Sequence, residues 1–140
     1  KNKNGGESRT AIWLKIFGDL MAKKILIVED ELDILRVVEF RLKKLNYEIF
    51  SAVNGKEALE LIRKIRPDLI FLDILLPVMD GYEVIRILKN DKELKSIPVV
   101  FLTASVVNIK EKAKEFNADD YLVKPFEPEE IIEKVKKFLG

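Results

Sequence analysis

The segment DLIFLDILLPVMDGYE, residues 68–83, decides the fold. It begins with a short, mostly apolar run at 68–72, which is typical of a strand buried on both faces of a parallel sheet. Asp73 follows that run directly, and a carboxylate is costly to bury there unless it is paired. A helix is expected at 82–89. The segment therefore predicts a buried strand that ends in a candidate functional carboxylate.

The same alternation of strands and helices continues on both sides of this segment. The apolar run KILIV at 24–28 predicts another buried strand, and Asn54 is suited to cap the start of a helix. In all, strands are expected at 24–28, 47–52, 68–72, 97–103 and 121–123, and helices at 31–45, 54–65, 82–89, 107–116 and 127–139. Strands that alternate with helices predict βαβ units and therefore a parallel sheet.

Composition limits the chemistry that the chain can perform. Its 140 residues suit a single domain, and 25 basic against 24 acidic residues give a net charge of +1. This balance gives no reason to expect binding to nucleic acid or to a membrane, and a cytoplasmic location is expected. The chain has no cysteine and no histidine, which excludes disulfides, thiol catalysis, Ser-His-Asp triads and a phosphohistidine within this chain.

Residues 1–20 differ in character from the rest of the chain. A polar start that contains Gly5 and Gly6 is followed by a segment, 10–20, whose apolar residues recur at helical spacing. Three origins are open for this extension: a linker or helix of a longer protein, an engineered appendage, or upstream sequence translated in error. The expected domain boundary is at Met21, so that residues 21–140 form the domain.

Polar residues follow the expected strands, where ligands of parallel sheets bind. Glu29 and Asp30 follow the first strand, Asp73 the third, Thr103 ends the fourth, and Lys124 follows the fifth. Clustered carboxylates repel one another, and a divalent cation relieves this repulsion. Ligands that are all oxygen favour Mg²⁺. An aspartate held beside Mg²⁺ and a lysine can attack phosphorus, because both cations offset charge on the phosphoryl oxygens.

Four blocks in this order carry a resemblance to a known family. They are ILIVEDE, DLIFLDILLPVMDGYE, PVVFLTA and NADDYLVKPF, at 25–31, 68–83, 98–104 and 117–126. Together they resemble the receiver domain of bacterial two-component response regulators, and the chemotaxis regulators among them, over residues 23 to 139. The resemblance implies a flavodoxin-like, doubly wound α/β fold with a five-stranded parallel sheet in the order 2-1-3-4-5 and five helices.

The resemblance also assigns roles at the ends of the strands. Asp73 matches the phosphoacceptor, and Lys124 matches the lysine that pairs with the phosphoryl group. Asp30 matches a direct Mg²⁺ ligand, Glu29 a ligand that acts through water, and the backbone carbonyl of Leu75 the third protein ligand. Taken singly, several of these residues also fit an ordinary structural role, such as an N-cap or a loop lysine.

The remaining matches concern switching and the backbone. Thr103 resembles the switch hydroxyl, and Tyr121 the aromatic residue that turns inward when that hydroxyl moves. Pro125 matches the family's cis proline. Pro77 and Gly81 match the loop after the phosphoacceptor.

Three positions vary within the family. Asn117 stands where glycine is common, and asparagine also tolerates the left-handed conformation. Leu75 and Ser105 occupy two variable positions that flank the site. Because Leu75 offers no polar side chain to orient attacking water, we expect slow self-dephosphorylation.

The expected partners follow from the same resemblance. The phosphoryl donor is a histidine kinase or a histidine phosphotransfer protein, and the recipient of the signal is a downstream protein or an output domain. Phosphorylation is expected to change the surface formed by residues 107–116, 121–123 and 127–139. This surface could also form a homodimer that depends on phosphorylation. Two alternatives are an unphosphorylated interaction module of the same fold and a flavin carrier. The flavin carrier fits less well, because the acids in the first turn would repel a flavin phosphate in the absence of a metal.

Overall fold

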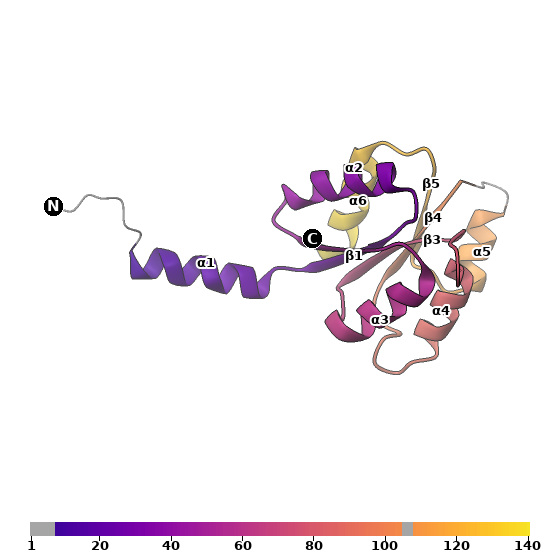
Figure 1. The fold of residues 1–140 in the computed structure, drawn as a ribbon, viewed down its shortest axis with the longest axis horizontal. Coiled ribbons are helices and arrows are strands. Elements are labelled where there is room, and N and C mark those ends of the chain that lie inside the picture. Colours follow the sequence, from indigo (N-terminus) through magenta and orange to yellow (C-terminus); the bar gives the residue numbers. More distant parts are fainter. Residues whose placement is uncertain (1–7, 105–107) are drawn as a thin grey trace.

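The computed structural model describes residues 8–104 and 108–140, and these form a five-stranded parallel sheet between two layers of helices (Figure 1). The strand order is β2-β1-β3-β4-β5, which confirms the expected flavodoxin-like, doubly wound architecture. The strands are β1 (Lys24–Val28), β2 (Glu48–Ala52), β3 (Leu69–Asp73), β4 (Val99–Thr103) and β5 (Asp120–Val123).

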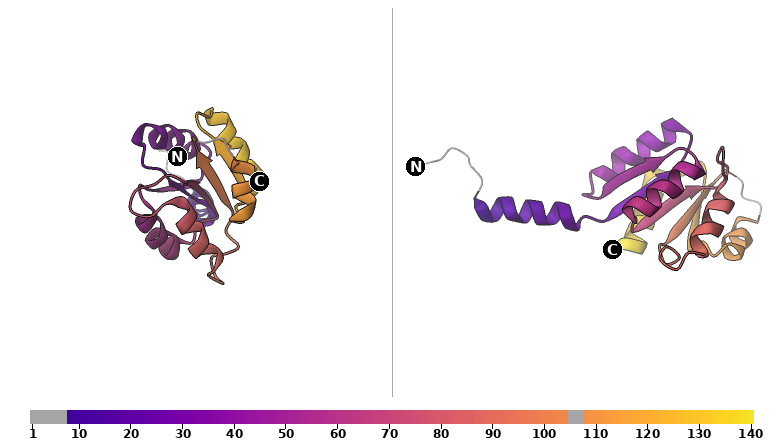
Figure 2. Two further views of the ribbon diagram at one scale, coloured as in Figure 1. Left: turned by 90° about the vertical axis from the view of Figure 1, so that its right-hand side faces the viewer. Right: turned by 60° about the horizontal axis from the view of Figure 1, so that its bottom comes forward.

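Six helices lie within the described part of the chain, the five that alternate with strands and one in the extension. They are α1 (Arg9–Met21), α2 (Leu32–Lys43), α3 (Gly55–Ile65), α4 (Gly81–Lys89), α5 (Ile109–Glu115) and α6 (Pro128–Leu139). Helices α2 and α6 cover one face of the sheet, while α3, α4 and α5 cover the other (Figures 1 and 2). No helix in the described ranges combines the length and apolar character needed to cross a membrane.

The strands are apolar because both of their faces are buried. Along β1, Leu26 and Val28 pack under α3, α4 and α5, while Ile25 and Ile27 pack under α2 and α6. Every residue of β3 and β4 is buried. This two-sided burial fixes the strand ends, and with them the site at the sheet's carboxyl edge.

Several element boundaries differ from the sequence-based expectations by a few residues. Asp68 precedes β3, and its Oδ2 accepts a hydrogen bond from the backbone N–H of Lys24 at 2.8 Å. The strand β4 begins after Pro98, which has no N–H to donate to a neighbouring strand. Asn54 caps α3 as expected, since its Oδ1 accepts from Glu57 N at 2.8 Å. Residue 107, at the start of one expected helix, lies outside the described residues.

The helix α1 projects away from the rest of the molecule (Figures 1 and 2). It confirms the helix expected in the extension and includes Met21, the residue at which the domain was expected to begin. The Trp13 and Phe17 rings stack at 5.4 Å between centroids, and both side chains remain exposed. Residues 1–7 of the extension lie outside the described ranges.

Candidate functional site

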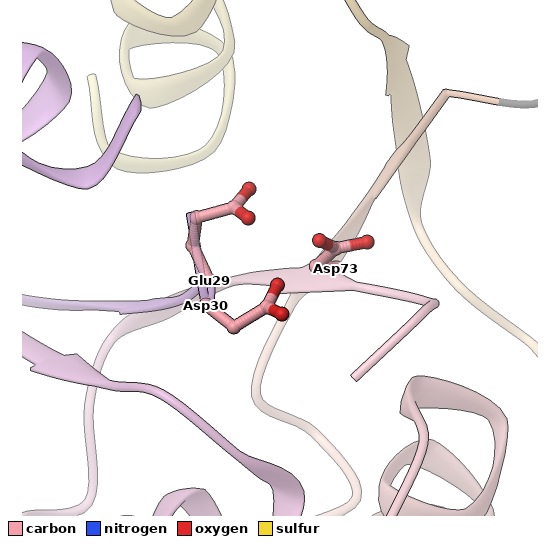
Figure 3. A group of neighbouring side chains, drawn as sticks. All are labelled: Glu29, Asp30 and Asp73. Atoms are coloured by element: carbon pink, nitrogen blue, oxygen red, sulfur yellow. The ribbon is translucent and has the colours of Figure 1, made fainter. Parts of the chain in front are cut away.

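The expected carboxylates meet at one edge of the sheet (Figure 3). Glu29 and Asp30 directly follow β1, and Asp73 is the last residue of the neighbouring strand β3. One carboxylate oxygen from each of the three lies within 4.8 Å of the others. Asp30 is exposed, so a cation could reach the group from solvent. An all-oxygen donor set that is partly open to water fits Mg²⁺, which keeps several of its own waters.

Lys124 contacts two of these three acids, Glu29 and Asp73. It follows β5, and its Nζ lies 2.9 Å from Asp73 Oδ2 and 2.7 Å from Glu29 Oε1. The Asp73 contact is a hydrogen bond, and the Glu29 contact is a close ion pair. A third carboxylate, Glu31 Oε1, lies 3.0 Å from the same ammonium. The sequence analysis did not single out Glu31, because it stands where a helix was expected to begin.

Burial strongly affects the charges at this site. The side chains of Glu29, Asp73 and Lys124 are 0%, 5% and 9% exposed. Burial raises the pKa of Glu29 to about 7, and the contacts with Lys124 and the Glu31 backbone N–H offset only part of that rise. Burial alone would lower the pKa of Lys124, but its carboxylate partners outweigh this and raise it. The lysine is therefore a permanent cation beside Asp73.

The loop after β3 holds Asp73 through its backbone. The Leu75 N–H donates to Asp73 Oδ1 at 3.1 Å, and the Gly81 N–H donates to the Ile74 carbonyl at 2.8 Å. A Cβ added at Gly81 would lie 2.5 Å from the Asp73 carbonyl oxygen, which is closer than side chains approach backbone. Glycine is thus required where α4 begins directly beneath the acid. The role of the Leu75 carbonyl as a metal ligand remains a prediction.

The two residues expected to act as a switch lie on adjacent strands. Thr103 ends β4 and is buried, and its backbone carbonyl accepts from Lys124 N at 2.7 Å. Tyr121 on β5 is partly buried and packs against the core beneath α3, α4 and α5. The Lys124–Pro125 peptide bond is cis, as the resemblance implied. Ser105 lies outside the described residues.

Asn117 confirms a smaller expectation about the backbone. It follows α5 with a φ of 60°, in the left-handed region that asparagine tolerates better than most residues. The chain therefore turns into β5 here without glycine.

A doubly wound sheet with acids and a lysine at its carboxyl edge is the arrangement that the resemblance to receiver domains implies, and comparison with known proteins agrees. The response regulator receiver domain family matches residues 25–136. The chain belongs to this family. Receiver domains of this kind are regulatory phosphoacceptors of two-component systems rather than conventional enzymes.

Individual relatives are similar over most of the chain. The probable transcriptional regulator ycf27 of Porphyridium aerugineum is 37% identical over 121 residues, which are 86% of this chain and 49% of that protein. The chain thus spans about half the length of this curated relative. The chemotaxis response regulator CheY4 of Vibrio cholerae is 32% identical, with a TM-score of 0.79 over 85% of this chain and 100% of that one.

A third similar protein is a receiver domain solved with a metal. It belongs to the sensor histidine kinase PA1611 of Pseudomonas aeruginosa and is 29% identical, with a TM-score of 0.77 over 85% of this chain and 98% of that one. In that structure a magnesium ion is coordinated in the active-site cleft.

Proposed function

We propose that this chain is a phosphorylation-activated switch whose phosphoacceptor is Asp73. The observation that carries the proposal is the 2.9 Å hydrogen bond between Lys124 Nζ and Asp73 Oδ2, beside a group of acids suited to a cation. A buried acid that is paired with a lysine and reachable from an open, acid-lined edge is positioned to act as a nucleophile toward phosphorus.

The transfer of the phosphoryl group to Asp73 neither consumes nor releases a proton. When a small acyl phosphate is the donor, a carboxylate oxygen of Asp73 forms the new bond to phosphorus, and the donor's carboxylate leaves with the electron pair. Glu29, Asp30, Asp73 and the Leu75 carbonyl would hold Mg²⁺, which offsets negative charge on the phosphoryl oxygens when it is bound. Lys124 supplies a second, permanent positive charge at the same place.

The donor histidine lies outside these 140 residues, which contain none. We assign this role to a histidine kinase or a histidine phosphotransfer protein. An apolar groove of about 300 Å³ beside the site offers a surface on which such a protein could dock. It is lined by residues of α2 and of the segment that leads into α6: Asp33, Ile34, Val37, Val38, Lys124, Pro125, Phe126 and Pro128.

Phosphorylation would be read out through Thr103 and Tyr121. The hydroxyl of Thr103 would turn toward the phosphoryl group, Tyr121 would turn further inward, and the surface of α5, β5 and α6 would change. That surface would bind a downstream protein, an output domain or a second copy of the chain. We place this switch in residues 21–140 and in the cytoplasm, and we expect a long phosphoryl lifetime from the apolar Leu75 side chain.

Mass spectrometry of the intact chain tests the proposal. The protein is mixed with Mg²⁺ and acetyl phosphate, and its mass is compared with that of Asp73→Asn and of a control, Asp33→Asn. Asp33 is an exposed acid in the first turn of α2. The proposal expects one phosphoryl group on the wild type and the control and none on Asp73→Asn. An unmodified wild type would instead favour an interaction module that does not use phosphorylation.

A further inference from the structure

Glu31 is the one partner of Lys124 that the proposed phosphoryl transfer leaves without a role. An ammonium group has three N–H donors. Its three carboxylate neighbours are Glu29 at 2.7 Å, Asp73 at 2.9 Å and Glu31 at 3.0 Å. In the described structure, Lys124 is therefore already surrounded by as many acids as it has donors.

The three acids differ in how easily they can release the lysine. Glu29 and Asp73 are buried, with 0% and 5% of their side chains exposed, so losing Lys124 would leave a buried charge without a partner. The Glu31 side chain is 61% exposed, and water can solvate it when the contact breaks. Exposed ion pairs contribute little to stability for the same reason. Glu31 is thus the partner that is exchanged at least cost.

A phosphoryl group on Asp73 requires such an exchange. It carries close to two negative charges and three strong acceptor oxygens, which compete for the donors of Lys124. It also adds negative charge near Glu31, so that repulsion weakens the Glu31 contact further. The backbone N–H of Glu31 donates to Glu29 Oε2 at 3.0 Å, which keeps this residue at the site before and after the exchange.

We propose that Glu31 is a positioning residue that holds Lys124 in the resting state and competes with the incoming phosphoryl group for it. This inference rests on the proposed function of Asp73. The Glu31 ion pair favours the unphosphorylated state, and its release accompanies phosphoryl transfer. Removing the charge while keeping the side-chain length should therefore make Asp73 easier to phosphorylate.

The test compares Glu31→Gln with the wild type at saturating Mg²⁺ and with acetyl phosphate as donor. We expect the rate of phosphoryl gain to rise about threefold, within the roughly 1.4- to 5-fold range that corresponds to an exposed ion pair. The matched control is Glu60→Gln, which makes the same change at an exposed acid in the middle of α3 and should leave the rate unchanged. Thermal melting confirms that each variant is folded.

A second measurement does not depend on the reaction. The side-chain ammonium of Lys124 is followed by ¹⁵N NMR in the unphosphorylated protein. Glu31→Gln should shift this signal and speed its hydrogen exchange, whereas the control Glu60→Gln should not.

The outcomes separate the two proposals. A wild type that gains no phosphoryl group overturns both the role of Asp73 and that of Glu31. If the wild type is phosphorylated but Glu31→Gln reacts at the same rate, only the role of Glu31 is overturned. The same holds if the rate rises equally in Glu60→Gln. An unchanged Lys124 signal in Glu31→Gln also overturns it.

Discussion

The buried carboxyl of Glu29 predicts that the metal-free protein loses stability as the pH rises toward neutrality. Burial raises the pKa of Glu29 from 4.5 to about 7 in the folded chain, so the folded state holds this proton more tightly than the unfolded state does. The stabilisation that this proton provides is complete below pH 4.5, the pKa of Glu29 in the unfolded chain. It is lost as the pH rises through about 7, the pKa in the folded chain. This direction is opposite to that of a carboxylate stabilised by its charge.

The size of the effect follows from the two pKa values. Between about pH 5 and about pH 8, the free energy of unfolding should fall by about 2 to 3 kcal/mol because of this one group. Added Mg²⁺ favours the ionised carboxylates, so it should raise stability more at about pH 8 than at about pH 5.

Urea denaturation in the presence of EDTA measures this dependence. The wild type, Glu29→Gln and the control Asp33→Asn are each unfolded at both pH values. The comparison uses the change within each protein, so any fixed effect of a substitution cancels. Glu29→Gln should lose most of the pH dependence, and Asp33→Asn should keep it. If the wild type and Glu29→Gln lose equal stability between the two pH values, the reasoning about Glu29 is wrong.

Three further predictions concern the rest of the domain. Burial alone would raise the pKa of Asp120, but hydrogen bonds from Lys134 and a second lysine of α6 lower it below its ordinary value of 3.8. Its contribution to stability should therefore be lost as the pH falls below 3.8, and acid unfolding should show a smaller loss in Asp120→Asn than in the wild type. Gly81→Ala should destabilise the fold by about 2 kcal/mol in urea denaturation, because its Cβ would press against the backbone of Asp73; an unchanged midpoint would contradict this. Val78 has a φ of 69°, which is costly for a β-branched residue, so Val78→Asn should stabilise the fold by about 1 kcal/mol. A melting temperature that falls in Val78→Asn would show that this backbone strain is absent.

The sequence was sufficient to predict the sheet because its strands are buried on both faces. Runs such as KILIV at 24–28 fit few structures besides a buried strand, and β1 occupies those five residues. Boundaries were less accurate where backbone bonding decides them. Residues 97 and 98 were assigned to a strand that begins at Val99, and Asp68 was assigned to β3 although its side chain bonds to Lys24. The pattern of hydrophobic residues does not indicate which backbone N–H groups form hydrogen bonds.

The site was predictable in its residues but not in all of its contacts. Glu29, Asp30, Asp73 and Lys124 follow strands whose ends must meet at one edge, so their proximity follows from topology. Glu31 was missed because its contact with Lys124 depends on the path of the chain between β1 and α2 and on side-chain length. A third acid directly after the Glu29–Asp30 pair was the only signal in the sequence that could have indicated it.

The direct test of the central claim is to identify the residue that carries the phosphoryl group. The protein is treated with acetyl phosphate and Mg²⁺, reduced with borohydride, digested and sequenced by mass spectrometry. Borohydride reduces an acyl phosphate to an alcohol, which marks the modified acid permanently. We predict reduction at position 73 alone, dependent on Mg²⁺ and abolished by EDTA. Reduction at another acid, or at none, would contradict the assignment of Asp73 as the phosphoacceptor.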